Sequence, residues 1–110
     1  MKYALLGILS IFGFLSPIKA NAYDWSVVGK VTFIEPTYAP NQLPFKIDTG
    51  NASCPAGALL SWNPQGTDSA SKIANYNAIL SVLLISKSTG QSVDVFVNNS
   101  GCTVTYIHLQ

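Results

Sequence analysis

Residues 71–90, SKIANYNAILSVLLISKSTG, are the only stretch after the amino-terminal segment that strongly predicts a helix. At about 100° per residue, its large apolar side chains fall on one broad face. That face contains Ile73, Tyr76, Ile79, Leu80, Leu83 and Leu84. Such a face must pack on something, and the strand-like remainder of the chain predicts a small sheet.

The back of the same helix carries a second apolar stripe, mostly of small residues. It contains Ala74, Ala78, Val82 and Ile85. A helix that is apolar on both sides is covered on both sides. Because one core in a chain this short covers one face, we predict that the second stripe meets a second subunit or a partner protein.

Five segments rich in β-branched and aromatic residues predict strands, separated by Pro, Gly and Asn. They span residues 26–35, 43–48, 58–62, 91–98 and 102–109. The helix falls between the third and fourth strands. A five-stranded barrel with a helix at that point is the OB-fold, although other small α+β folds share this order. We therefore predict a mainly-β, OB-fold domain over residues 23–110.

The amino-terminal residues have the pattern of a secretory signal peptide. Lys2 precedes an apolar run from Ala4 to Leu15, and Ala20-Asn21-Ala22 provides small residues for cleavage after Ala22. The run is shorter than the roughly 20 residues that span a bilayer, so a membrane anchor is the weaker interpretation. The sequence predicts a leader over residues 1–22 and a secreted or periplasmic protein without membrane insertion.

Removing the predicted leader leaves a chain with little charge. Of six lysines and five acidic residues, Lys2 and Lys19 are removed, which leaves four lysines, five acids and a net charge of −1. Arginine is absent from the sequence. Without a basic cluster, nucleic acid is not an expected partner.

Cys54 and Cys102 are the only two cysteines. In a chain directed to an oxidising compartment they predict one disulfide. A metal site is the weaker alternative, since the single histidine, His108, has no clustered ligands around it. No cofactor is expected.

The supply of catalytic groups is small. Glu35, Asp48, Asp68 and Asp94 lie in different elements, without the spacing of a glycosidase carboxylate pair. The sequence has no phosphate-binding loop and no nucleophile motif. We expect a binding protein rather than an enzyme.

Aromatic rings beside Asn or Asp suit the apolar faces and hydroxyl groups of sugars. Trp25, Tyr38 and Trp62 have such a context. Each has a structural alternative: Trp62 would close one end of the barrel, Trp25 would stack on the domain as an ordered amino-terminal arm, and Tyr38 would be an ordinary loop tyrosine. The loops in which this fold usually binds ligands add candidates. The predicted ligand-binding residues are Tyr38, Asn41, Trp62, Asn98 and Asn99.

One family resemblance arises from a cysteine after the second strand, the segment Thr89-Gly90-Gln91-Ser92-Val93 and a late Gly101-Cys102. These features resemble B subunits of AB5 toxins, of the subtilase-cytotoxin and pertussis-like type. The resemblance implies an OB-fold, a pentameric homo-oligomer with central helices, glycan binding, and a catalytic A subunit as partner.

The sequence therefore predicts an exported glycan- or receptor-binding module that acts as a homo-oligomer. The alternative is a non-enzymatic structural or inhibitory protein of the periplasm or cell surface. Such a protein would bind another protein through its apolar helix.

Overall fold

The computed structural model describes residues 22–110, so the predicted leader lies outside the described residues apart from Ala22. This part of the chain forms six strands, one α-helix and two 3-10 turns. In order they are β1 (Trp25–Gly29), β2 (Val31–Ile34), η1 (Pro36–Tyr38), β3 (Leu43–Ile47), β4 (Leu60–Trp62), α2 (Ser69–Thr89), β5 (Val93–Asn98), η2 (Ser100–Cys102) and β6 (Thr103–Leu109).

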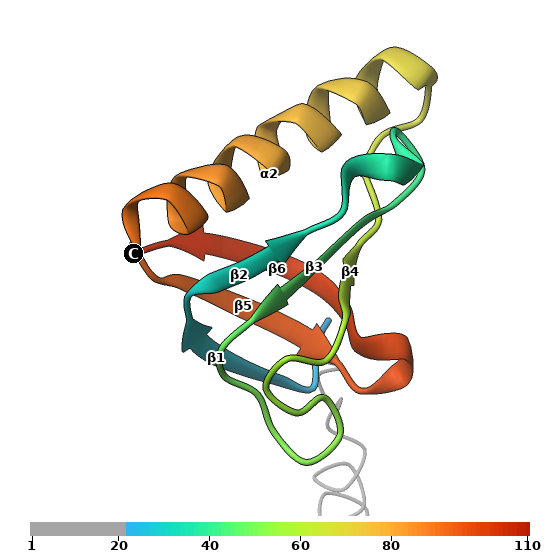
Figure 1. Cartoon of the computed structure of the whole chain (residues 1–110). Helices are drawn as coiled ribbons and strands as arrows, with labels where there is room; N and C mark the ends of the chain where they lie inside the picture. The colour runs from blue at the N-terminus through green and yellow to red at the C-terminus, as the bar shows by residue number, and fades with distance from the viewer. Residues whose placement is uncertain (1–21) are drawn as a thin grey trace, which may run out of the picture.

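The strands form one curled sheet in the order β1-β5-β6-β4-β3-β2, with α2 lying along one side of it (Figure 1). Neighbouring strands are antiparallel except for β4 and β6, which are parallel. The mainly-β prediction with a single helix is confirmed for the described residues. The curled sheet is consistent with an OB-like fold, although it has six strands rather than the predicted five.

The sixth strand arises because the strand predicted at residues 26–35 is broken at Lys30. The Lys30 N–H donates to Asp48 Oδ1 at 2.8 Å, and the Asp48 N–H donates to the Lys30 carbonyl at 3.1 Å. Gly29 permits this close approach, since a Cβ there would lie 2.3 Å from Thr49 Oγ1. The chain changes partners at the break, as β1 pairs with β5 and β2 with β3. The helix therefore follows the fourth strand rather than the third.

The hydrophobic core lies between the inner face of the sheet and α2. Its buried members come from every strand except β1, from α2 and from the disulfide. They are Val31, Leu43, Phe45, Ile47, Cys54, Leu60, Trp62, Tyr76, Leu83, Val93, Val95, Val97 and Val104. Each large apolar side chain buried in this way stabilises the fold by about 1.5–3 kcal/mol relative to solvent exposure.

Both ends of α2 are capped by the residues that the sequence favours. The Ser71 N–H donates to Asp68 Oδ1 at 2.7 Å, which satisfies a free N–H of the first turn and lowers the pKa of the Asp68 carboxyl. Gly90 ends the helix in the left-handed conformation, with φ 75°, and its N–H donates to the Ser86 carbonyl. These contacts fix the length of the helix against the sheet.

The face that α2 turns to the sheet is rotated from the predicted one. Tyr76, Leu83 and Ser86 are buried, and Ile79, Leu80 and Val82 pack against the core. Ile73 and Leu84, which were predicted to face the core, are 47% and 49% exposed. The prediction for these two residues is wrong because it placed polar side chains outward, whereas Ser86 points inward.

Ser86 is buried because its hydroxyl accepts a hydrogen bond from a backbone N–H at the strand break. The Val31 N–H, the first after the break, donates to Ser86 Oγ at 3.1 Å in a buried position. We expect Ser86→Ala to lower the free energy of unfolding by about 1–3 kcal/mol, the cost of leaving a buried N–H without a partner. Urea denaturation would measure the loss.

Ser81→Ala is the matched control, because Ser81 is exposed and its hydroxyl bonds only the Asn77 carbonyl of its own helix. It should change stability by less than about 0.5 kcal/mol. Equal effects of the two substitutions would show that the Ser86 bond does not hold the helix on the strand break.

Candidate functional site

The outer face of β1, β5 and β6 presents a regular array of side chains. Along β5 the three valines are buried, while Asp94, Phe96 and Asn98 alternate with them on the outer face. Phe96 is opposite Tyr106 of β6, and Asp94 is opposite His108. On the other side, β1 places Ser26 and Val28 beside the same two β5 residues.

An aromatic cluster forms at the centre of this outer face. The Tyr23 ring stands edge-on to Phe96, with centroids 4.9 Å apart, and to Tyr106 at 6.2 Å. Phe96 also packs edge-on against Tyr106 at 5.9 Å and lies 4.9 Å from the His108 ring. Edge-to-face packing at these distances is favourable for aromatic pairs. Tyr106 nevertheless stays 46% exposed, so part of the cluster is open to a ligand.

The segment before β1 is fastened across the end of the β5–β6 hairpin. The Ala22 carbonyl accepts from Asn98 Nδ2 at 3.2 Å and from Thr105 Oγ1 at 3.0 Å. The Asp24 carboxylate accepts from the Asn99 N–H at 2.8 Å. The Asp24 N–H also donates to the Val97 carbonyl at 2.9 Å, so the two Asp24 bonds hold Tyr23 over the aromatic cluster without Ala22.

The structure places the predicted ligand residues at two separate ends of the sheet. Tyr38 and Asn41 are exposed at the η1 turn, near the amino-terminal end of α2. Asn98 and Asn99 lie at the β5–β6 turn, at the other end (Figure 1). Asn99 Oδ1 also accepts from Trp25 Nε1 at 2.8 Å, so Trp25 supports this turn.

Trp62 is a core residue, with only 5% of its surface exposed. Its Nε1 donates to Asn75 Oδ1 at 2.8 Å, and the same oxygen accepts from the Gln65 N–H at 2.9 Å. The indole ring is therefore buried and its N–H bonds within the fold, so neither is presented to a ligand. Its burial favours a structural role for Trp62.

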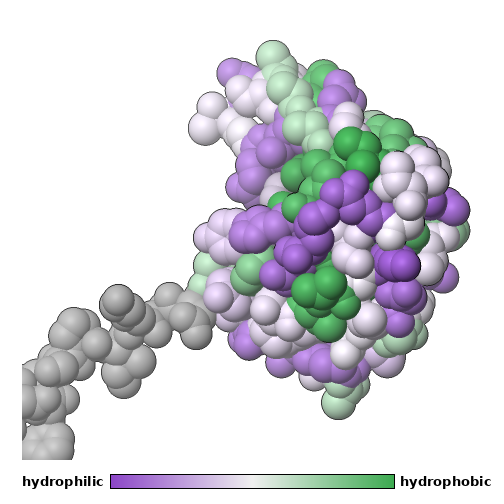
Figure 2. Space-filling model, turned by 90° about the vertical axis from the view of Figure 1, so that its left-hand side faces the viewer, coloured by the Kyte–Doolittle hydropathy of each residue, from purple (hydrophilic) through white to green (hydrophobic). Residues whose placement is uncertain are grey.

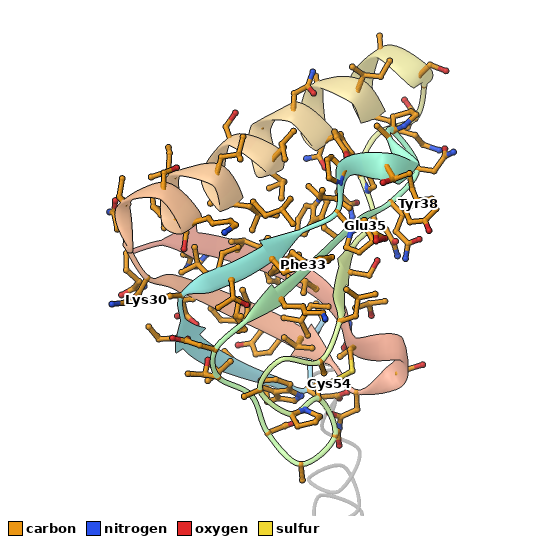
Figure 3. The ribbon with its side chains drawn as sticks, viewed as in Figure 1. Lys30, Phe33, Glu35, Tyr38 and Cys54 are labelled. Carbon is orange, nitrogen blue, oxygen red and sulfur yellow. A yellow bond between two sulfur atoms is a disulfide. The ribbon has the colours of Figure 1, made fainter. Side chains whose placement is uncertain are left out.

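Figure 3 shows the side chains along β2, from Lys30 at one end through Phe33 to Glu35 and Tyr38 at the η1 turn. Lys46 Nζ stands 4.8 Å from the centroid of the Phe33 ring, in cation–π geometry. The Tyr38 side chain is 52% exposed, but it belongs to none of the close aromatic pairs of the described residues.

The outward face of α2 has a high apolar content and little charge. Ala74, Ala78 and Ile85 of the predicted interface are exposed, whereas Val82 is half-buried and packs against the core. The only charged residues of the helix are Lys72 and Lys87. On the face near the carboxyl-terminal end of α2, hydrophobic side chains reach the surface in separate groups among hydrophilic ones (Figure 2).

The predicted disulfide between Cys54 and Cys102 is present. It ties the segment before β4 to the β5–β6 turn, beside the end of the outer face (Figure 3). A disulfide is typical of proteins in an oxidising compartment.

Among residues 22–110 there is no group of three or more His, Cys, Asp or Glu side chains placed to hold a metal ion. No enclosed pocket is present in this part of the chain. The same residues contain no helix that is long and apolar enough to cross a bilayer. The part-exposed aromatic cluster is the candidate site that the side-chain geometry of the described residues favours.

No family model and no curated protein matches this sequence.

Sequence reasoning missed Tyr23, Phe96 and Tyr106 as a group. Alternation along residues 93–98 places Asp94 and Phe96 on the face opposite the valines. Pairing the last two strands as a hairpin would have placed Tyr106 beside Phe96. Tyr23 had no local signal, since its ring packs on Phe96 and Tyr106, more than seventy positions away.

Proposed function

We propose that this chain is an exported, disulfide-bonded binding module that recognises glycans on its outer β1-β5-β6 face. The observation that carries the proposal is the part-exposed aromatic cluster of Tyr23, Phe96 and Tyr106, flanked by Asp94 and Asn98. Aromatic rings pack against the apolar C–H faces of sugars, while carboxylate and amide groups bond the hydroxyls. A receptor glycoprotein is the natural source of such a ligand.

Topology supports an OB-fold for this module. If β1 and β2 are counted as one strand broken at Lys30, the sheet order becomes one-four-five-three-two-one, with the two halves of the first strand at opposite edges. The third and fifth strands are then the parallel pair, and the helix joins the third strand to the fourth. Counted in this way, the arrangement supports the proposal of an OB-fold barrel.

Predicted leader cleavage would open the edge of the proposed glycan site. Cleavage after Ala22 removes the carbonyl that accepts from Asn98 Nδ2 and Thr105 Oγ1. Each group would then lose one partner beside the aromatic cluster, while Asn98 Nδ2 would still donate to Thr105 Oγ1 at 3.1 Å. The cleaved protein would therefore have hydrogen-bonding capacity at Asn98 and Thr105, where the sugar hydroxyls are expected.

Assembly into a homo-oligomer, a pentamer by the resemblance, is part of the same proposal. The exposed helix residues Ala74, Ala78 and Ile85 are small or apolar and would allow close subunit contact. Several copies would raise the avidity of a weak, open site by placing many sites on one glycan-bearing surface. A catalytic A subunit is a proposed partner of such an assembly.

Tyr106→Ala tests the glycan site. We expect glycan-array binding by the purified protein to fall by about tenfold, which corresponds to about 1.4 kcal/mol and lies within the range for loss of a central aromatic contact. Folding should be retained, because Tyr106 is half-exposed on the outer face.

Tyr38→Ala is the matched comparison, because Tyr38 is a similarly exposed tyrosine at the η1 turn. It should leave glycan binding unchanged. Loss of binding through Tyr38 instead of Tyr106 would move the site to the η1 turn, and absence of any glycan binding would refute the function.

The second candidate function is a structural or inhibitory protein that binds another exported protein through α2. The observation that favours it is the nearly uncharged outward face of the helix. Sedimentation of the purified protein separates the two functions: a stable monomer without glycan binding supports this candidate, whereas a homo-oligomer that binds glycans supports the first.

A further inference from the structure

The residues on both sides of the predicted leader cleavage bond are held by the fold. Ala22 precedes the bond, and its carbonyl accepts from Asn98 Nδ2 at 3.2 Å and from Thr105 Oγ1 at 3.0 Å. Tyr23 follows the bond, and its ring packs edge-on to Phe96 with centroids 4.9 Å apart. The Ala22–Tyr23 peptide is therefore fastened to the β5–β6 hairpin, although Ala22 itself is exposed to solvent.

The next two residues extend this attachment along the hairpin. The Asp24 N–H donates to the Val97 carbonyl at 2.9 Å, and the Asp24 carboxylate accepts from the Asn99 N–H at 2.8 Å. Trp25 begins β1 opposite Val97, and its Nε1 donates to Asn99 Oδ1 at 2.8 Å. The disulfide at Cys102 ties the same turn to the segment before β4. The chain is thus bonded to the sheet on both sides of the cleavage bond.

A peptidase needs this segment to be free. Proteases bind the substrate backbone as an extended strand, through hydrogen bonds like those that add a strand to a sheet. The Ala22 carbonyl and the Asp24 N–H already bond the β5–β6 hairpin. These bonds and the packing of Tyr23 must open before cleavage, so only the small locally opened population of folded molecules can be cut.

We infer that leader cleavage takes place before the domain folds, and that the folded domain protects the Ala22–Tyr23 bond. In the cleavage step, water is added across the amide. The C–N bond breaks, the hydroxyl group of the water completes the Ala22 carboxyl group, and the Tyr23 nitrogen takes the proton. A chain that folds and forms its disulfide first would keep its leader. The inference rests on the exported-protein part of the proposed function and is independent of glycan binding.

The test is cleavage of the purified full chain by a signal peptidase in mild detergent. The two substrates are the folded, oxidised chain and Leu83→Asp, which has the same sequence around the bond but carries a charge at a position with no exposed surface, where it is expected to prevent folding. We expect the Leu83→Asp chain to be cleaved at least about tenfold faster, because hydrogen bonds and an aromatic contact keep most folded molecules closed. Mass spectrometry should place the new amino terminus at Tyr23.

Phe96→Ala tests the protecting contact within the folded chain. Phe96 lies far from the bond in the sequence, so its substitution leaves the segment that the peptidase recognises unchanged. Loss of the packing on Tyr23 should speed cleavage of the folded chain by about threefold. Phe33→Ala is the matched control, because Phe33 is a part-exposed phenylalanine on β2 that packs with Lys46. It should leave the cleavage rate of the folded chain unchanged.

Each contrary outcome overturns a stated part of the inference. Equal cleavage of the folded and Leu83→Asp chains overturns the protection. Cleavage of neither chain, or at another bond, overturns the assignment of Ala22–Tyr23 as the processing bond. Equal acceleration by Phe96→Ala and Phe33→Ala overturns the role of the Tyr23 contact. Glycan binding is measured separately on the cleaved protein, so its failure would refute the glycan site and leave the protection intact.

Discussion

The free energy of unfolding is expected to fall by about 4 kcal/mol when Cys54 and Cys102 are both replaced by alanine. The disulfide closes a loop with a sequence separation of 48 residues. Loop-closure entropy in the unfolded chain accounts for a loss of that size. A small domain has only about 5–15 kcal/mol of stability, so the variant should be unfolded or close to it at physiological temperature. Chemical denaturation at low temperature would measure the change.

The natural protein treated with a thiol reductant is the control for this variant. Because both lack the cross-link, their stabilities should agree within about 1 kcal/mol. A double-alanine variant as stable as the oxidised protein would show that the cross-link does not support the fold.

Leu83→Asp is expected to abolish folding. Leu83 has no exposed surface, and loss of a buried leucine alone costs about 2–5 kcal/mol. The aspartate would also carry an unpaired charge into the core, which adds a further penalty. Together these terms equal or exceed the stability of a small domain. Circular dichroism of the purified variant would show the loss of folded structure.

Ile85→Asp is the matched variant two positions along the same helix. Ile85 is 42% exposed, so each subunit should keep its fold. In a homo-oligomer that packs through this face, the new charge should separate the subunits, and sedimentation should give the mass of one subunit. Unfolding of both variants would contradict the orientation of α2, and an unchanged oligomer in Ile85→Asp would contradict its role in assembly.

Local patterns in the sequence predicted the helix, although it begins at Ser69 rather than at residue 71. Asp68 and Gly90 act through neighbours within four positions, so their roles are visible in the sequence itself. The rotation of the helix was harder to predict. Ser86 faces the core because it bonds the Val31 N–H, 55 positions away. The local sequence around Ser86 does not indicate this long-range hydrogen bond.

Long-range contacts also explain the other differences. The break at Lys30 depends on Asp48, and the aromatic cluster depends on which strands become neighbours. Trp62 combined an aromatic ring with a polar context, which is typical of a ligand contact. Asn75 from the helix satisfies its N–H inside the fold instead. Polar context alone therefore does not separate a binding tryptophan from a core one.

The most direct measurement of the proposed function is a backbone NMR titration of the exported protein with a glycan that it binds. The account predicts that shift changes centre on Asp94, Phe96 and Tyr106, with smaller changes at Asn98. Changes confined to the η1 turn around Tyr38 and Asn41, or no changes at all, would contradict it.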